Sequence, residues 1–149
     1  MSKAYFIFLS MKKILVLCTG NSCRSQIAEG YLRHFGRDRI EVYSAGVETH
    51  GVNPRAIEIM KEDGIDISNH TSNNLTEYLS IPFDIILTVC DHAQEVCPVF
   101  PGLAKKVHHN FPDPAKTTGS EEEIQHSFQE VRNQIKNYCR SMVDELDEN

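Results

Sequence analysis

With 149 residues, a formal charge of −6 and a pI near 5.6, the chain has the size of one globular domain and lacks the basic excess of a nucleic-acid-binding surface. Apolar residues make up 40% and charged residues 24%, close to the globular average, which excludes a disordered chain. Five cysteines are an odd number, and no secretory pattern precedes them, so reduced cytoplasmic thiols are expected rather than a disulfide framework.

The first residues contain a short apolar run, AYFIFL, which is too brief to span a bilayer and has no cleavage pattern after it. Met11 opens a second plausible start, MKKILVLC. We therefore interpret residues 1–10 as an extension, either an artefact of the start assignment or a disordered tail, and residues 11–149 as a single domain. Neither a membrane nor a nucleic acid is expected as a partner.

Strand and helix patterns alternate from residue 13 onward. Lys13–Leu17, apolar after its lysine, is typical of a strand buried on both faces. Residues 25–35 carry apolar side chains at helical spacing, which predicts a helix. Ile40–Ala45 is rich in β-branched and aromatic residues and predicts a second strand. Asn53 and Pro54 suit the cap and the first position of the next helix.

The second half continues this alternation. Phe83–Val89 predicts another buried strand, and the polar segment after Cys90, bounded by Pro98, is expected to be helical. Lys105–His108 predicts a short fourth strand, and Glu121–Leu146 is the clearest helix. Its apolar stripe consists of Ile124, Phe128, Val131, Ile135, Tyr138 and Met142. Strands alternating with helices imply an α/β fold with a parallel sheet.

The most specific motif is Cys18-Thr-Gly-Asn-Ser-Cys-Arg24-Ser25, placed between the first strand and the first helix. Five residues separate Cys18 from Arg24, a loop length that lets backbone N–H groups surround a tetrahedral oxyanion at a helix N-terminus. That field, together with Arg24 and the Ser25 hydroxyl, is expected to lower the pKa of Cys18 and supply a thiolate nucleophile. The expected substrate-binding residues are Thr19, Gly20, Asn21, Ser22, Cys23, Arg24 and Ser25.

A bare Cys-x5-Arg match occurs by chance, and Cys18 would then be a core residue and Arg24 a surface residue. The strand-to-helix setting, with Gly20 and Asn21 able to adopt unusual backbone angles, favours the catalytic interpretation.

On these residues the chain resembles the thioredoxin-coupled arsenate reductases, which share the fold and anion loop of the low-molecular-weight tyrosine phosphatases. The matching stretches are CTGNSCRSQIAEG, YSAGVETHGVNPRAIEIMKEDGIDISNHTS, FDIILTVCDHAQEVCP and FPDPA. The resemblance implies a flavodoxin-like four-stranded parallel sheet flanked by helices, with Cys18 at its carboxyl edge. It also implies arsenate as the substrate, a thioredoxin-like reductant as the partner, and no organic cofactor.

Cys90 and Cys97 distinguish the reductase interpretation from the phosphatase one, because the resemblance makes them relay thiols. A helix running from Cys90 to Cys97 would place the sulfurs about two turns apart, so a disulfide requires that part of it to unwind. The alternatives are two ordinary half-buried cysteines or a zinc site. Zinc is disfavoured because the chain lacks the tight Cys-x2-Cys spacing.

Asp113 lies in a Phe-Pro-Asp-Pro stretch that could simply be a turn, and the resemblance makes it the proton donor to the departing oxygen. Cys23 is expected to be structural, although the corresponding cysteine of the related phosphatases can pair with the nucleophile on oxidation. Cys139, off the centre of the last helix's stripe, is expected to be inert. His50 and His70 are expected to pack in polar loops.

The resemblance also raises potassium as a cofactor, because some family members hold this ion near the anion loop. The matching positions are Asn21, Glu29 and Ser44, but Asn73 replaces a further acidic ligand. An amide offers a carbonyl oxygen and removes a charge, which puts potassium binding in doubt.

The mechanism expected from these residues is attack of Cys18 on arsenate, with Arg24 clamping the oxyanion and Asp113 protonating the departing hydroxyl. Cys90 then attacks Cys18 and releases arsenite, and Cys97 resolves the disulfide.

Two other functions stay open at this point. The first is a tyrosine phosphatase of the same fold, although Ala115-Lys116 stands where the phosphatases usually place aromatic residues. The second is a thiol module that binds a soft metal or arsenite without catalysis.

Overall fold

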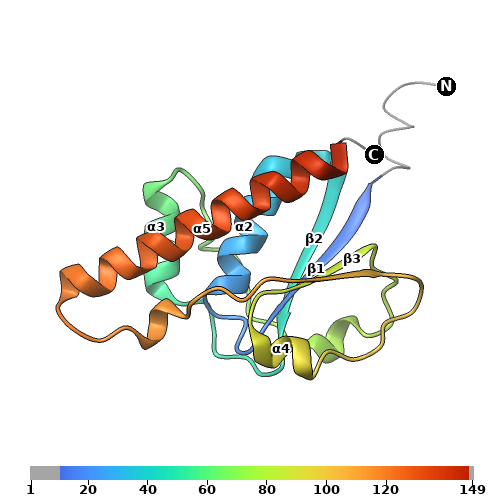
Figure 1. Cartoon of the computed structure of the whole chain (residues 1–149), viewed down its shortest axis with the longest axis horizontal. Helices are drawn as coiled ribbons and strands as arrows, with labels where there is room; N and C mark the ends of the chain where they lie inside the picture. The colour runs from blue at the N-terminus through green and yellow to red at the C-terminus, as the bar shows by residue number, and fades with distance from the viewer. Residues whose placement is uncertain (1–10, 148–149) are drawn as a thin grey trace.

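The computed structural model describes residues 11–147, and these form one four-stranded, wholly parallel sheet (Figure 1). The strands are β1 (Lys12–Cys18), β2 (Ile40–Gly46), β3 (Ile85–Thr88) and β4 (Lys105–His108), in the order β2-β1-β3-β4. This confirms the predicted flavodoxin-like sheet. The predicted extension at residues 1–10 lies outside the described residues, so its interpretation stays a prediction.

Helices fill the connections between the strands. They are α2 (Arg24–Gly36), α3 (Pro54–Glu62), α4 (Asp91–Glu95) and α5 (Glu121–Asp147), with single-turn 3-10 helices η1 (Arg37–Arg39), η2 (Leu75–Tyr78) and η3 (Pro114–Lys116). Asn53 caps α3 as predicted, since its side chain accepts a hydrogen bond from the Arg55 N–H. None of the helices in this part of the chain has the length and hydropathy needed to cross a bilayer.

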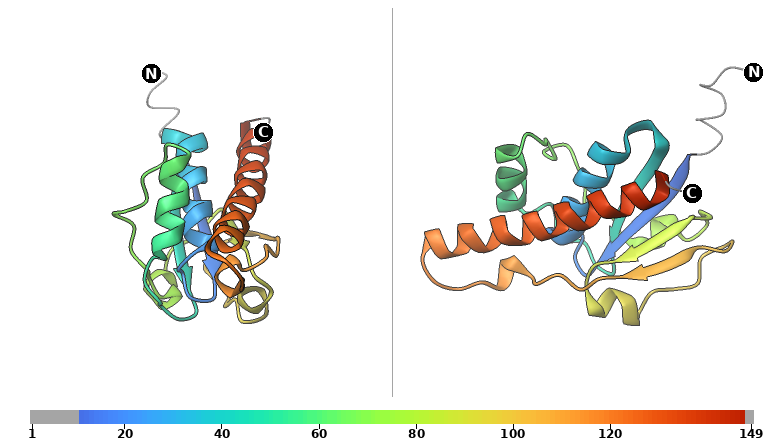
Figure 2. Two further views of the ribbon diagram at one scale, coloured as in Figure 1. Left: turned by 90° about the vertical axis from the view of Figure 1, so that its left-hand side faces the viewer. Right: turned by 45° about the horizontal axis from the view of Figure 1, so that its top comes forward.

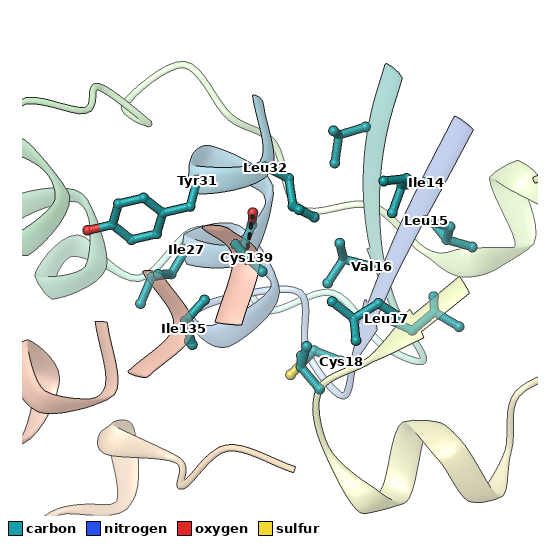
Figure 3. Packing of buried hydrophobic residues seen from close by; sticks show 14 of the residues in the cluster. Ile14, Leu15, Val16, Leu17, Cys18, Ile27, Tyr31, Leu32, Ile135 and Cys139 are labelled. Atoms are coloured by element: carbon teal, nitrogen blue, oxygen red, sulfur yellow. Dashed lines mark hydrogen bonds between the residues drawn. The ribbon is translucent and has the colours of Figure 1, made fainter. Parts of the chain in front are cut away.

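The core lies between the sheet and the α2–α5 layer, as Figure 3 shows from close by. Ile14–Cys18 of β1 are almost completely buried because β1 has a strand on each side and helix α2 against it. Ile27 of α2 lies beside Ile135 of α5, and Leu32 lies on the side of α2 that faces β1 (Figure 3). Burying each such side chain stabilises the fold by roughly 1.5–3 kcal/mol. The packing of α2 on β1 therefore holds the end of β1 and the start of α2 in place.

Helix α5 lies across α2 and α3, and its buried stripe differs from the predicted one near its end (Figure 2). Phe128, Val131 and Ile135 are buried as predicted, Tyr138 and Met142 are partly buried against the core, and the fully buried stripe continues through Cys139 and Val143. A straight α-helix drifts by about 20° per heptad from a strict 3.5-residue repeat, which moves the contact stripe round the helix. The expectation that Cys139 lies off the centre of the stripe was therefore wrong.

The strand before Cys90 and the helix after it are both shorter than predicted. β3 covers only Ile85–Thr88 of the predicted Phe83–Val89, and α4 ends at Glu95. A helix reaching Cys97 was the wrong assumption, because Pro98 disfavours helical backbone angles at the residue before it. Cys97 therefore lies beyond the helix, after its last capping residue Val96.

Candidate active site

The anion loop, residues 18–24, connects the end of β1 to the start of α2 at the carboxyl edge of the sheet. Its carbonyl groups point outward, because the segment from Val47 to Asn53 runs alongside and donates backbone hydrogen bonds to them. The pairs are Val47 to Cys18 (3.3 Å), Glu48 to Thr19 (2.9 Å), His50 to Gly20 (3.0 Å) and Asn53 to Ser22 (2.9 Å). The parallel pairing of Cys18 with Gly46 brings this segment to the loop.

Two glycines make this close approach feasible. A Cβ atom on Gly46 would lie 2.4–2.7 Å from backbone atoms of Glu48, Asn21 and Thr19, so only glycine fits there. A Cβ atom on Gly20 would lie 2.5 Å from Nδ1 of His50, which packs over the loop. His50 is thus placed at the rim of the site, which sequence spacing alone did not indicate.

Asn21 holds the shape of the loop from inside the protein. It is fully buried and has a positive φ of 48°, a conformation that asparagine tolerates better than most residues. Its side-chain amide donates to Ser25 Oγ (2.8 Å) and Ser44 Oγ (3.0 Å), and its carbonyl oxygen accepts from the Asn73 N–H (2.8 Å). The predicted binding residue Asn21 therefore supports the loop through its side chain, which is directed away from the cavity.

The loop surrounds a cavity of about 250 Å³ whose wall includes the Cys18 side chain. Within residues 11–147, no carbonyl or side chain accepts a hydrogen bond from the backbone N–H groups of Gly20 to Cys23. Free donors beside an N-terminal helical turn form a binding site for a tetrahedral anion. The cavity is lined by Cys18, Thr19, Gly20, Ser22, Cys23, Arg24, His50, Asp113, Ala115 and Lys116, so it holds most of the predicted loop residues; Asn21 and Ser25 instead lie behind it.

Arg24 and Asp113 lie opposite each other at this cavity. Arg24 Nη1 donates to the carbonyl oxygen of Phe111 at 3.0 Å, and Nη2 lies 3.6 Å from Asp113 Oδ2. Asp113 is fixed as the cap of η3, because Oδ1 accepts the Ala115 N–H at 3.1 Å. The prediction of a rigid loop holding this carboxyl at the anion site agrees with its position, whereas the Phe111 contact carries no signal in the sequence.

Cys90 follows β3 and lies beside Cys18, close enough for a thiol–thiol hydrogen bond to shift the pKa of both. Thr19 Oγ1 lies 3.3 Å from the Cys90 sulfur. The hydrogen bond to Cys90, followed by burial, raises the pKa of Cys18 far above its usual range. The same hydrogen bond lowers the pKa of Cys90 to about 5. The two thiols thus share one proton and carry one negative charge near neutral pH, which Arg24 stabilises.

From the sequence, a lowered pKa was expected for Cys18 alone, whereas in the structure the negative charge belongs to the pair formed by Cys18 and Cys90. The sequence analysis counted Arg24 and the loop, but it omitted a second thiol in contact with the first. Residues 18 and 90 are brought together only because β1 and β3 are neighbours in the sheet.

Cys97, the third relay residue, is half-buried and contacts the carbonyl oxygen of Pro98 through its sulfur at 3.6 Å. Burial raises the pKa of Cys97, and the charge of Lys106 acts in the opposite direction. It lines a different cavity from Cys18, one of about 130 Å³ beside β3 and β4. The structure therefore brings Cys18 and Cys90 together and leaves Cys97 apart.

The other two cysteines are buried. Burial, followed by the charge of Asp113, raises the pKa of Cys23 to about 12, so it stays a thiol beside the loop. Cys139 is completely buried under α2, where its sulfur lies 3.8 Å from the Ala28 carbonyl oxygen, and burial raises its pKa. Because both stay protonated thiols near neutral pH, neither supplies the thiolate that a reactive cysteine requires.

The four residues matched to a potassium site are close together, but their oxygen atoms are already engaged. Glu29 accepts the Ser44 hydroxyl at 2.6 Å and Arg33 Nε at 2.9 Å, and His70 Nε2 lies 3.5 Å away. Asn73 Oδ1 accepts the Thr71 hydroxyl, and Asn21 directs its amide nitrogen towards Ser44. Because Arg33 already neutralises Glu29 and the other oxygen atoms have hydrogen-bond partners, the residues present do not fit a bound potassium ion.

His70 packs in a polar loop, as was expected of it. Its Nδ1 lies 3.0 Å from Gln26 Oε1, so it connects α2 to the segment that follows α3. Burial lowers the pKa of His70, and the charge of Glu29 opposes that effect.

Comparison with known proteins identifies relatives over nearly the whole chain. Residues 13–149 match the family described as low molecular weight phosphotyrosine protein phosphatase. An arsenate reductase from Halalkalibacterium halodurans is 49% identical over 127 residues, which cover 85% of this chain and 91% of that protein. An arsenate reductase from Bacillus subtilis is 46% identical over 133 residues, covering 89% and 96% respectively.

A solved structure of an arsenate reductase in the phosphate binding state superimposes with a TM-score of 0.79 at 31% identity. The superposition covers 91% of this chain and 99% of the chain of the solved arsenate reductase. The likeness therefore extends from the sequence to the arrangement of the strands and helices.

Proposed function

The chain belongs to the low-molecular-weight phosphotyrosine protein phosphatase family and, within it, to the arsenate reductases, and on that premise we propose that it reduces arsenate to arsenite. One observation carries the proposal beyond similarity. A second thiol, Cys90, lies beside the nucleophile candidate Cys18, which lines the anion cavity, close enough for a thiol–thiol hydrogen bond. A phosphatase needs one thiol, whereas reduction of arsenate requires two electrons, which two thiols supply when they form a disulfide.

In the first step the loop N–H groups and Arg24 bind arsenate over Cys18. The proton of Cys18 passes along the hydrogen bond to Cys90, and the Cys18 thiolate forms a sulfur–arsenic bond. An arsenate oxygen leaves as water, with Asp113 supplying the proton that the leaving hydroxyl needs. The position of Asp113 beside Arg24 supports this role.

In the second step Cys90 attacks the sulfur of Cys18. A Cys18–Cys90 disulfide forms, the sulfur–arsenic bond breaks, and its electron pair stays on arsenic, which leaves as arsenite with the proton of Cys90. The overall reaction converts arsenate and two thiols into arsenite, water and a disulfide. The contact between the two sulfurs supports this step, because no large movement is needed to bring them together.

In the third step Cys97 attacks Cys90 and releases Cys18, and a thioredoxin-like protein then reduces the Cys90–Cys97 disulfide. Because Cys97 lies in a separate cavity, the segment around α4 has to rearrange. Val99 and Leu103, which follow Cys97, are 90% and 102% exposed. Exposed apolar side chains beside a relay thiol suit docking of a protein reductant.

Phosphotyrosine hydrolysis is the second candidate, because the family description and the anion loop both fit it. The rim of the cavity argues against it as the main activity. His50, Ala115 and Lys116 stand there, and no aromatic ring of phenylalanine, tyrosine or tryptophan lines the cavity in the described part of the chain. A substrate ring would therefore lack a stacking partner.

The proposal is tested by supplying the purified chain with arsenate, thioredoxin, thioredoxin reductase and NADPH. We expect arsenate-dependent NADPH oxidation and arsenite production, both abolished in Cys18→Ser, which keeps the residue's size and should keep the fold. Hydrolysis of a phosphate ester without any arsenate-dependent NADPH oxidation would instead establish the phosphatase. Stoichiometric binding of arsenite or a soft metal without turnover would establish the thiol module.

A further inference from the structure

A chain of hydrogen bonds lies next to the relay and joins three elements through one imidazole ring. His108, the last residue of β4, has Nδ1 2.7 Å from Thr88 Oγ1 and Nε2 2.7 Å from Asp91 Oδ1. Thr88 ends β3 and Asp91 begins α4. Figure 2 shows β3 and β4 side by side, with α4 at their carboxyl ends.

The two residues bonded to His108 flank Cys90 along the chain. Thr88 lies two residues before Cys90 and Asp91 directly follows it, so one side chain holds the backbone on both sides of this thiol. Asn110 adds a further tie, because its Oδ1 accepts the Asp91 N–H at 3.1 Å.

The chain of bonds persists in either charge state of the ring. In the neutral ring, Nε2–H donates to the Asp91 carboxylate and Nδ1 accepts the Thr88 hydroxyl proton. In the protonated ring both nitrogens donate, and the Thr88 hydroxyl can donate to the Val107 carbonyl oxygen 3.5 Å away. The ring therefore acts as a fixed link between the strands and α4.

His108 also borders the space around the third relay thiol. The cavity of about 130 Å³ that contains Cys97 is lined in addition by Gln94, Lys106 and His108. His108 thus contacts the residues on either side of Cys90 and lines the same cavity as Cys97.

We propose that His108 is a positioning residue of the disulfide relay, which holds Cys90 against Cys18 by bonding to Thr88 and Asp91. The inference rests on the proposed function. His108 exchanges no electron and no proton in the step: the Cys90 sulfur bonds to Cys18, the sulfur–arsenic bond breaks, and arsenic keeps the electron pair. Misplacing a reacting group by about 1 Å can cost on the order of 100-fold in rate.

The test uses the full chain carrying Cys97→Ser, in which the relay stops at the first disulfide. Rapid-quench measurement of arsenite release and of the Cys18–Cys90 disulfide gives the rate of the step, and calorimetry with inorganic phosphate gives the affinity of the anion loop. For His108→Ala we expect at least a roughly 10-fold slower step, with phosphate affinity unchanged. His108→Gln, whose amide can still donate to Asp91, should recover much of the rate.

Asp91 provides a second variant, because its side chain is 67% exposed and its loss should not unfold the protein. Asp91→Ala should also slow the step, and the double variant should be no slower than His108→Ala alone, since His108→Ala already removes the bond to Asp91. His126→Ala, on the exposed side of α5, serves as the matched control. A wild-type rate in both His108→Ala and Asp91→Ala would overturn the proposal, as would an equal loss of rate and of phosphate affinity.

Failure of the inference is distinguishable from failure of the proposed function. If the parent chain releases no arsenite, the reductase assignment is wrong whatever His108 does. If the parent releases arsenite and the variants match its rate, only the positioning role is wrong.

Discussion

Cys18 and Cys90 share one proton, and this pairing leads to a prediction about thiolate content. Ultraviolet thiolate absorbance should show one thiolate per chain at neutral pH, lost as the pH falls through about 5, the pKa to which the hydrogen bond from Cys18 lowers Cys90. Removing that bond by Cys18→Ala should raise the pKa of Cys90. The matched control, Cys90→Ser, should lose the low-pH transition. A first transition near the ordinary thiol value of about 8.5 would contradict the shared proton.

The lowered pKa of Cys90 also determines how this residue's contribution to the free energy of unfolding depends on pH. Because the pKa of Cys90 is lowered in the folded protein, its thiolate contributes stability at pH values above the unfolded thiol's pKa. That contribution is lost as the pH falls towards about 5.

Asp113 is predicted to act through its proton. In Asp113→Asn the amide oxygen can still accept the Ala115 N–H, so η3 should keep its cap. The rate of arsenite formation should nevertheless fall by about 10²–10⁴-fold, the usual cost of losing a general acid. The rate of arsenite formation is measured in this variant and in Asp38→Asn, a control substitution at an exposed position. An unchanged rate would make Asp113 a turn residue only.

The sequence identified individual site residues where they share one short motif. It identified few of the contacts between residues of different motifs. Cys18, Arg24 and the loop glycine follow from a fixed local spacing, and Asp113 became a candidate through resemblance. The Phe111 carbonyl that holds Arg24 depends on strand order, which no local pattern encodes.

Among the elements, the anion loop depends most on Asn21. Asn21→Ala would strain a residue at positive φ and leave the buried Ser44 hydroxyl and Asn73 N–H short of partners. Together these effects should lower the free energy of unfolding by about 2 kcal/mol or more. Urea unfolding of this variant, with exposed Asn137→Ala on α5 as the control, tests the expectation. Equal midpoints for the two variants would show that the loop is held without Asn21.

Glu29 of α2 and Ser44 of β2 are hydrogen-bonded at the place matched to a potassium site, and this contact leads to a prediction about the ion. Arg33 and His70 already face Glu29, so exchanging sodium chloride for potassium chloride at equal ionic strength should leave the unfolding temperature unchanged. Differential scanning calorimetry in the two salts measures it. A potassium-specific rise in the unfolding temperature would show that the ion displaces these side chains.

Element types followed from periodicity, whereas several boundaries did not. Lys105–His108 was predicted to the residue, although Val107 is the only typical strand former in this run. α4 stops short of Cys97 because Pro98 acts on the residue before it, and α5 turns its stripe towards Cys139 because a straight helix does not repeat every seven residues.

The whole molecule has a formal charge of −6, yet the proposed substrate is an anion. Long-range attraction therefore cannot deliver arsenate to the site, and binding must come from the free N–H groups of the loop with Arg24, and with Lys116 and His50 at the rim. The parallel sheet brings together the ends of β1 and β3, and with them the two thiols that react first. The sequence pattern predicted a parallel α/β fold, but the neighbours of each strand followed only from the family resemblance.

The order of the relay gives the most direct test of the account, through single-turnover arsenite yield combined with disulfide mapping by mass spectrometry. Cys97 acts only after arsenite has left, so Cys97→Ser should release about one equivalent of arsenite per chain and then stall as a Cys18–Cys90 disulfide. Cys90→Ser should release none, because it lacks the thiol that completes the transfer of electrons to arsenic. Sustained thioredoxin-coupled turnover by Cys97→Ser, or arsenite release by Cys90→Ser, would contradict the relay.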